Sequence, residues 1–174
     1  PADVARKITD KTRAILAVDF AGQPCDYEAL GSLAEANGLT LIADACHAVG
    51  ASLNGQAVGS IADFSVFSFH PVKHIAAGEG GIVTTDDVDA AKHMKIFRNH
   101  GITADHHART EEGSWFYEMV ELGYNYRLSD IHSALAESQL GKLEASVRRR
   151  RVIAQRYNDS FLEMPGISPL VERP

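Results

Sequence analysis

Two apolar runs with a capped helical stretch between them constrain the fold of this chain more than any other feature. Residues 14–18 and 39–43 are continuous apolar runs of strand length, which is typical of strands buried in a sheet. Between them, Asp26 is a favourable N-cap, and the helix that it begins is predicted to end at Asn37 and Gly38. A strand, a helix and a strand in this order form a βαβ unit, so we expect an α/β fold with a mainly parallel sheet flanked by helices.

The remaining chain supplies more elements of the same kind. Residues 63–69 are apolar at nearly every position and predict a third strand, and residues 82–85 predict a fourth. Asp86 and Asp87 predict the cap of a helix that runs to about residue 100. Residues 100–121 form a long polar segment, which is typical of a functional loop or an interface. Residues 129–163 predict one long helix, of the kind that forms a coiled coil or bridges two domains.

Composition limits the function classes. The chain has 174 residues, the length of one domain, and a net charge of −6, which argues against a nucleic-acid partner. Its two cysteines, Cys25 and Cys46, have no metal-site spacing and form no disulfide framework, so we expect a reducing, cytoplasmic environment. No signal peptide and no apolar run of membrane-spanning length occurs in the sequence, so no membrane partner is expected.

The segment 68–81 carries the chemistry. It places Lys73 directly after an apolar strand and before a glycine-rich turn, and Asp44 ends another apolar strand 29 residues earlier. In open α/β sheets, ligands bind in the crevice outside the carboxyl ends of the strands. An amine that can form a Schiff base, facing a carboxylate that can hold a pyridinium nitrogen, meets the chemical requirement for pyridoxal phosphate (PLP).

Four segments together resemble one family. Residues 44–48, 62–69, 73–81 and 123–130 are similar to those of the DegT/DnrJ/EryC1/StrS sugar aminotransferases, in the same order and at compatible spacings. The resemblance covers essentially the whole chain and implies the fold-type I, aspartate aminotransferase-like architecture of PLP-dependent transferases. It implies that residues 1–128 belong to the PLP-binding large domain and that residues 129–174 lead to a C-terminal small domain, so the chain is a fragment of the full fold.

The resemblance also implies site residues. Lys73 would form the Schiff base with PLP and move the proton during amino transfer, and Asp44 would keep the pyridine nitrogen protonated. Ser68 would donate to the cofactor phosphate, and His47 would contact the ring or its 3′ oxygen. Asn125 would reach the phosphate of the neighbouring subunit's cofactor. From the residues alone, Ser68 can also be a small polar strand end, His47 a structural histidine and Asn125 a turn residue.

Within the family, the segment 68–81 is most similar to the transaminases of pseudaminic acid synthesis. That similarity implies transfer of an amino group from L-glutamate to C4 of a UDP-linked 4-keto-6-deoxy-N-acetyl hexose, in a homodimer with shared active sites. Two alternatives stay open: a PLP-dependent nucleotide-sugar dehydratase of the same family, and a non-catalytic scaffold. Dehydratases of this kind carry histidine at the lysine position, so Lys73 favours amino transfer. The sugar nucleotide and the face of C4 that is protonated cannot be predicted from these residues.

Two further expectations concern what the chain lacks. His100, His106 and His107 form a histidine group without regular spacing or carboxylate partners, so no metal site is predicted. The family enzymes are longer at both ends. We therefore expect uncovered sheet edges and apolar surface, and poor solubility, when this chain is expressed alone.

Overall fold

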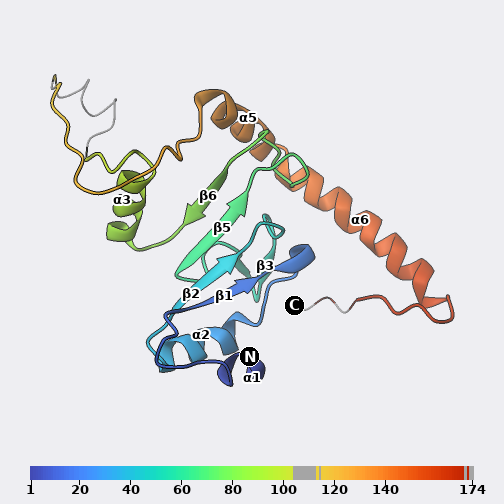
Figure 1. Cartoon of the computed structure of the whole chain (residues 1–174). Coiled ribbons are helices and arrows are strands. Elements are labelled where there is room, and N and C mark those ends of the chain that lie inside the picture. Colours follow the sequence, from blue (N-terminus) through green and yellow to red (C-terminus); the bar gives the residue numbers. More distant parts are fainter. Residues whose placement is uncertain (104–112, 114, 171, 173–174) are drawn as a thin grey trace. The chain divides into compact units, whose positions relative to one another are not determined.

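The computed structural model describes residues 1–103, 113, 115–170 and 172 (Figure 1). The chain divides into two compact units. One unit comprises Pro1–Thr84 and Asp130–Pro174, and the other comprises Thr85–Ser129. The predicted division at residue 128, into a large domain and the start of a small one, stays a prediction.

The first unit is built on a four-stranded sheet with the order β1-β2-β5-β6. Its strands are β1 (Ala14–Val18), β2 (Thr40–Asp44), β5 (Phe64–Ser68) and β6 (Gly81–Thr84). The pairs β1–β2 and β2–β5 are parallel, which confirms the predicted mainly parallel α/β sheet. Strand β6 is antiparallel to β5, because the connection between them contains no crossover helix.

Helix α2 (Tyr27–Ala36) covers one face of this sheet. Its predicted cap is confirmed, since Asp26 Oδ1 accepts the N–H of Ala29 at 3.1 Å. The core consists of alternate strand residues packed against the inner face of the helix: Ile15, Ala17, Leu41, Ala43, Tyr27, Leu30 and Ala34. Smaller elements of the same unit are α1 (Ala2–Ala5), the 3-10 turn η1 (Phe20–Gly22) and the hairpin of β3 (Ser52–Leu53) and β4 (Gln56–Ala57).

Strand β1 is buried on one face only, which corrects the prediction of a fully buried strand. Ile15 and Ala17 are buried, whereas Leu16 is 63% exposed and Val18 is 47% exposed. The apolar run therefore has a second apolar face that the described residues leave uncovered.

The last helical stretch of the first unit differs from the prediction. Instead of one helix over 129–163, the structure has α5 (Asp130–Leu140) and α6 (Leu143–Leu162), with a break at Gly141 and Lys142. Glycine is a poor helix former, so it is a favourable place for such a break. In the part of the chain that the structure describes, no helix has the length and apolarity to cross a membrane.

The second unit contains α3 (Val88–Phe97), capped as predicted by Asp87, whose Oδ1 accepts the N–H of Ala90 at 2.9 Å. Phe97 at the end of α3 packs edge-on against Tyr124, and Tyr124 stacks on Tyr126 with ring centroids 5.1 Å apart. Much of the predicted irregular segment, residues 104–112 and 114, lies outside the described residues.

Candidate functional site

The candidate site begins where two parallel strands end together. In the sheet register, Val18 of β1 pairs with Asp44 of β2, so Asp19 follows directly at the same edge. The N–H of Asp19 donates to the carbonyl oxygen of Asp44 at 3.0 Å and extends the ladder by one bond. Two carboxylates thus lie at the carboxyl end of the sheet, where this class of fold binds its ligands.

Asp44 is held as an ionised carboxylate. Its Oδ1 accepts the N–H of Cys46 at 3.2 Å. The hydrogen bond from the Cys46 thiol is the largest cause that lowers the pKa of Asp44, against the opposing effect of partial burial, and the charges of His47 and Lys73 lower it further. Burial and the Asp44 carboxylate raise the pKa of the Cys46 thiol to about 11, so the thiol stays protonated. Its sulfur lies 3.7 Å from the carbonyl oxygen of Val66, to which it can also donate. An acceptor of this kind suits a protonated ring nitrogen.

Lys73 lies on a turn that folds back on its own strand. The N–H of Lys73 donates to the carbonyl oxygen of His70 at 2.9 Å. Across the base of the loop, the N–H of Phe69 donates to the carbonyl oxygen of Gly80 at 2.8 Å. Glycine is required at the start of β6, because a Cβ on Gly81 would lie 2.6 Å from the Phe67 carbonyl oxygen. This close return of the backbone follows β5, the strand next to β2, which ends at Asp44. Lys73 is half-buried there, and its charge is one of the smaller causes that lower the pKa of Asp44.

Ser68 ends β5 at the same edge of the sheet. Its Oγ accepts the N–H of His70 at 3.2 Å, which leaves the hydroxyl hydrogen able to donate to a ligand. The hydroxyl is therefore compatible with the predicted phosphate contact, and the role itself stays a prediction.

His47 is oriented by the η1 turn. The N–H of Ala21 donates to His47 Nδ1 at 3.3 Å, and the ring of Phe20 lies 5.5 Å from the imidazole, centroid to centroid. Because a backbone N–H can only donate, Nδ1 must be the acceptor, and a neutral His47 carries its proton on Nε2. The ring therefore offers an N–H donor on the side that faces away from Ala21.

Asp19 anchors this turn and was missed as a functional candidate in the sequence. Its fully buried Oδ1 accepts the N–H of Cys25 at 2.9 Å and the hydroxyl of Tyr27 at 2.8 Å. Burial, followed by the Asp19 hydrogen bond, raises the pKa of Tyr27, so Tyr27 remains a neutral donor. The signal was available, because Asp19 ends its strand just as Asp44 does.

The structure therefore brings together three predicted residues, Asp44, His47 and Lys73, with Ser68 at the same edge of the sheet. Asn125 belongs to the second unit, where it is exposed and forms an isolated bridge with Asn99. Its predicted contact with a neighbouring subunit's cofactor stays a prediction.

The histidine group of His100, His106 and His107 lies mostly outside the part of the chain that the structure describes. His106 and His107 lie outside the described residues. Among the residues that are described, no group of three metal-ligating side chains gathers.

This set of side chains fits PLP. Lys73 supplies an amine, ionised Asp44 can accept from a pyridinium nitrogen, and Ser68 can donate to a phosphate. His47 adds an N–H donor beside them. These are among the binding and electronic contacts that PLP needs from a protein.

Relatives in sequence point the same way. The chain is 41% identical over 173 residues to an uncharacterized protein of Methanocaldococcus jannaschii, covering 98% of this chain and 45% of the relative. It is 40% identical over 164 residues to the UDP-4-amino-4,6-dideoxy-N-acetyl-beta-L-altrosamine transaminase of Campylobacter jejuni, covering 94% of this chain and 42% of that enzyme.

Solved structures agree with the fold. Helicobacter pylori PseC, an aminotransferase involved in the biosynthesis of pseudoaminic acid, matches with a TM-score of 0.84 and 35% identity, over 92% of this chain and 41% of PseC. The PLP form of the putative sugar aminotransferase Spr1654 of Streptococcus pneumoniae matches with a TM-score of 0.83 and 32% identity, over 92% and 44% of the two chains. The chain spans less than half the length of each of these relatives.

The model of the DegT/DnrJ/EryC1/StrS aminotransferase family matches residues 1–174. The fold, the relatives and this match agree, and the chain belongs to the DegT/DnrJ/EryC1/StrS aminotransferase family.

Proposed function

We propose that the protein containing this chain is a PLP-dependent sugar aminotransferase. The observation that carries the proposal is the gathering of Lys73 and His47 around the ionised carboxylate of Asp44, at the carboxyl ends of parallel strands. When bound, PLP supplies an electron sink that stabilises negative charge on the carbon next to the transferred nitrogen.

The residues of this chain would divide the work. Asp44 accepts a hydrogen bond from the ring nitrogen and keeps it protonated, with Cys46 holding the carboxylate in place. Lys73 Nζ holds the cofactor and then moves the proton on and off the reacting carbon. Ser68 donates to the phosphate, His47 Nε2–H donates toward the ring or its 3′ oxygen, and Asn125 serves the cofactor of the second subunit.

For the substrates, we infer L-glutamate as the donor and C4 of a UDP-linked 4-keto-6-deoxy-N-acetyl hexose as the acceptor. The names of the Campylobacter jejuni transaminase and of Helicobacter pylori PseC support this choice. We further infer a cytoplasmic homodimer that shares its active sites.

The experiment is a visible absorption spectrum of the full-length protein with PLP, before and after L-glutamate. We expect an absorption band that depends on Lys73 and that L-glutamate removes. Lys73→Ala should abolish the band, whereas Lys92→Ala, at an exposed lysine of α3, should leave it unchanged. A band that is insensitive to L-glutamate, or that persists in Lys73→Ala, would contradict the proposal.

The sugar substrate needs a separate measurement. Incubation with L-glutamate and the UDP-linked keto sugar should yield the 4-amino sugar and 2-oxoglutarate in equal amounts. A dehydrated sugar without consumption of L-glutamate would instead identify a dehydratase.

A further inference from the structure

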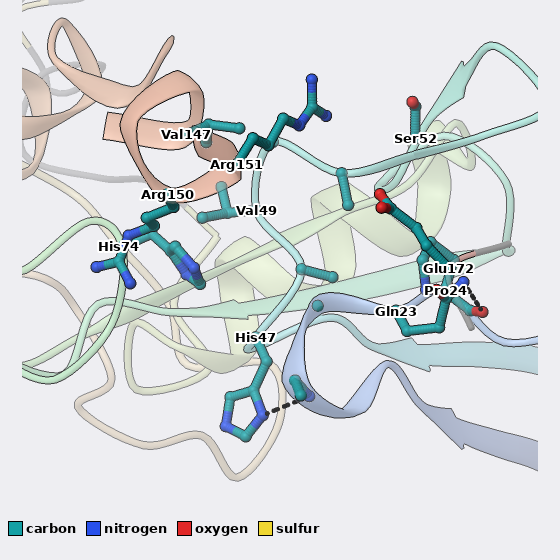
Figure 2. A pocket seen from close by; sticks show the side chains of 15 residues that line it. Gln23, Pro24, His47, Val49, Ser52, His74, Val147, Arg150, Arg151 and Glu172 are labelled. Carbon is teal, nitrogen blue, oxygen red and sulfur yellow. Dashed lines mark hydrogen bonds between the residues drawn. The ribbon is translucent and has the colours of Figure 1, made fainter. Parts of the chain in front are cut away.

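The η1 turn holds the imidazole of His47 by two contacts. His47 and the turn residues Ala21 and Gly22 line the same pocket of the first unit (Figure 2). The dashed line at His47 in Figure 2 is the hydrogen bond that Nδ1 accepts from the N–H of Ala21 at 3.3 Å. The ring of Phe20 lies against the same imidazole, with centroids 5.5 Å apart. The hydrogen bond selects the nitrogen that stays without a hydrogen, and the ring contact limits rotation of the imidazole.

The backbone of this turn has an unusual conformation. Ala21 has a φ of 55°, in the left-handed region that residues other than glycine rarely adopt. Gly22 follows with a φ of 90°, and a Cβ on it would lie 3.1 Å from the carbonyl oxygen of His47. The turn therefore packs closely against His47. A strained conformation of this kind persists only where the surrounding structure holds it in place.

Asp19 supplies the hydrogen bonds that hold the turn on both sides. Its N–H donates to the carbonyl oxygen of Asp44 at 3.0 Å, and its own carbonyl oxygen accepts the N–H of Gly22 at 3.2 Å. After the turn, the N–H of Cys25 donates to Asp19 Oδ1 at 2.9 Å. The hydroxyl of Tyr27, in the first turn of α2, donates to the same oxygen at 2.8 Å. One fully buried residue thus joins the strand end, the turn and the helix.

The two carboxylate oxygens of Asp19 differ in their surroundings. Oδ1 accepts both side-chain bonds, whereas Oδ2 is buried and has no hydrogen-bond partner in the part of the chain that the structure describes. An asparagine can therefore keep both bonds through its side-chain oxygen, with its amide nitrogen at the place of Oδ2. An alanine keeps neither bond. This pair of substitutions separates the hydrogen bonds of Asp19 from its negative charge.

We propose that Asp19 is a positioning residue for His47, because its carboxylate holds the turn that fixes the tautomer and the orientation of the imidazole. Side chains that contact a cofactor need neighbours that lock their position. The consequence for the reaction rests on the proposed function, in which His47 Nε2–H donates toward the ring or the 3′ oxygen of PLP. In this role Asp19 acts only through the turn and moves no proton.

The first test needs no cofactor. The full-length protein is labelled with 15N in its histidines, and the two ring nitrogens of His47 are assigned by their loss in His47→Gln. At a pH where the imidazole is neutral, the wild type and Asp19→Asn should show one tautomer, with the hydrogen on Nε2. In Asp19→Ala, both nitrogen shifts should move toward the averaged values of an imidazole that exchanges between its tautomers.

Asp63→Ala is the matched control. Asp63 Oδ2 accepts the N–H of Leu41 at 2.8 Å, so this substitution also removes a bond from a carboxylate to the backbone, but at the amino ends of β2 and β5. It should leave the His47 shifts unchanged. If Asp19→Ala does not fold, Asp19→Glu replaces it, because the extra methylene group prevents the carboxylate from keeping both bonds without moving the turn.

Three results would overturn the proposal. The first is unchanged His47 shifts in folded Asp19→Ala or Asp19→Glu. The second is an equal change in Asp63→Ala, which would reflect a general loss of structure. The third is a change in Asp19→Asn as large as in Asp19→Ala, because the charge of Asp19 and not its hydrogen bonds would then act on His47.

The second test uses the protein loaded with PLP. The pH midpoint of the absorption band that depends on Lys73 should shift in the same direction in His47→Gln and in Asp19→Ala. The double variant should shift no further than His47→Gln alone, because both substitutions act through one imidazole. Additive shifts would contradict positioning through His47. If no band forms, the proposed function fails, and the nitrogen shifts of the cofactor-free protein still decide the role of Asp19.

Discussion

Asp44 shows how one residue couples the site to the stability of the fold. The Cys46 thiol, above all, holds the pKa of Asp44 below its usual value of 3.8 in the folded protein. The stabilisation that follows is fully present above that usual value and is lost as the pH falls through the lower folded-state pKa. We therefore expect the free energy of unfolding to fall less for Asp44→Asn than for the wild type between pH 5 and pH 2. The difference between the two should be under about 1 kcal/mol, because solvent screens this partly exposed group.

Urea unfolding of the cofactor-free protein at each pH measures this difference. Asp26→Asn is the control, because Asp26 caps α2 away from Cys46 and Lys73. Parallel pH profiles for the wild type and Asp44→Asn would show that the carboxylate contributes nothing to acid sensitivity.

Single residues also mark the limit of prediction from sequence. Lys73 and Asp44 could be selected because each follows an apolar strand, and strand ends are where ligands bind. Asp19 obeys the same rule but was missed, since no partner for it was visible along the chain. Its partners, the N–H of Cys25 and the hydroxyl of Tyr27, come from the turn that follows the strand, and their direction is set only in three dimensions.

At the level of elements, local signals predicted helix caps better than a break inside a helical stretch. Asp26 and Asp87 were identified as helix caps because a short acidic side chain can accept the free N–H groups of the first turn. The break between α5 and α6 was missed, because the apolar pattern continues through Gly141 and a single glycine only weakens a helix. The exposed face of β1 was also missed, since a continuous apolar run gives no sign of which faces are covered.

The seating of α6 depends on Gly50, and this can be tested with a matched pair of glycines. Gly50 and Gly55 have nearly the same left-handed backbone, with φ of 83° and 82°. Of the two, only Gly50 has neighbours within 4 Å of the position that an added methyl group would take, on Leu143 and Val147. Gly55→Ala should cost about 1 kcal/mol for backbone strain alone. Gly50→Ala should cost about 1–3 kcal/mol more, because the new methyl group overpacks against α6.

Thermal or urea unfolding of both variants gives the comparison. Equal destabilisation by the two substitutions would mean that α6 is not held closely at Gly50.

At the scale of the whole molecule, one face of the sheet at β1 is left uncovered by the residues that the structure describes. Leu16, Val18 and Phe20 are 63%, 47% and 72% exposed, and they lie on or directly after β1, an edge strand. Contiguous apolar side chains at an unpaired strand edge promote self-association. The same strand buries Ile15 and Ala17 in the core, so its two faces have opposite environments.

We therefore expect the 174-residue chain to self-associate through this face. The double variant Leu16→Thr with Val18→Thr keeps residues that favour strands but removes apolar area, and it should weaken association about tenfold or more. Analytical ultracentrifugation over a range of concentrations measures the change. Val152→Thr with Leu162→Thr is the control, because it removes similar apolar area from α6, where the side chains are 53% and 74% exposed. If the α6 variant weakens association as strongly as the β1 variant, the association is non-specific and does not arise from the sheet face. If only the β1 variant weakens association, the exposed face of β1 forms the contact between copies of the chain.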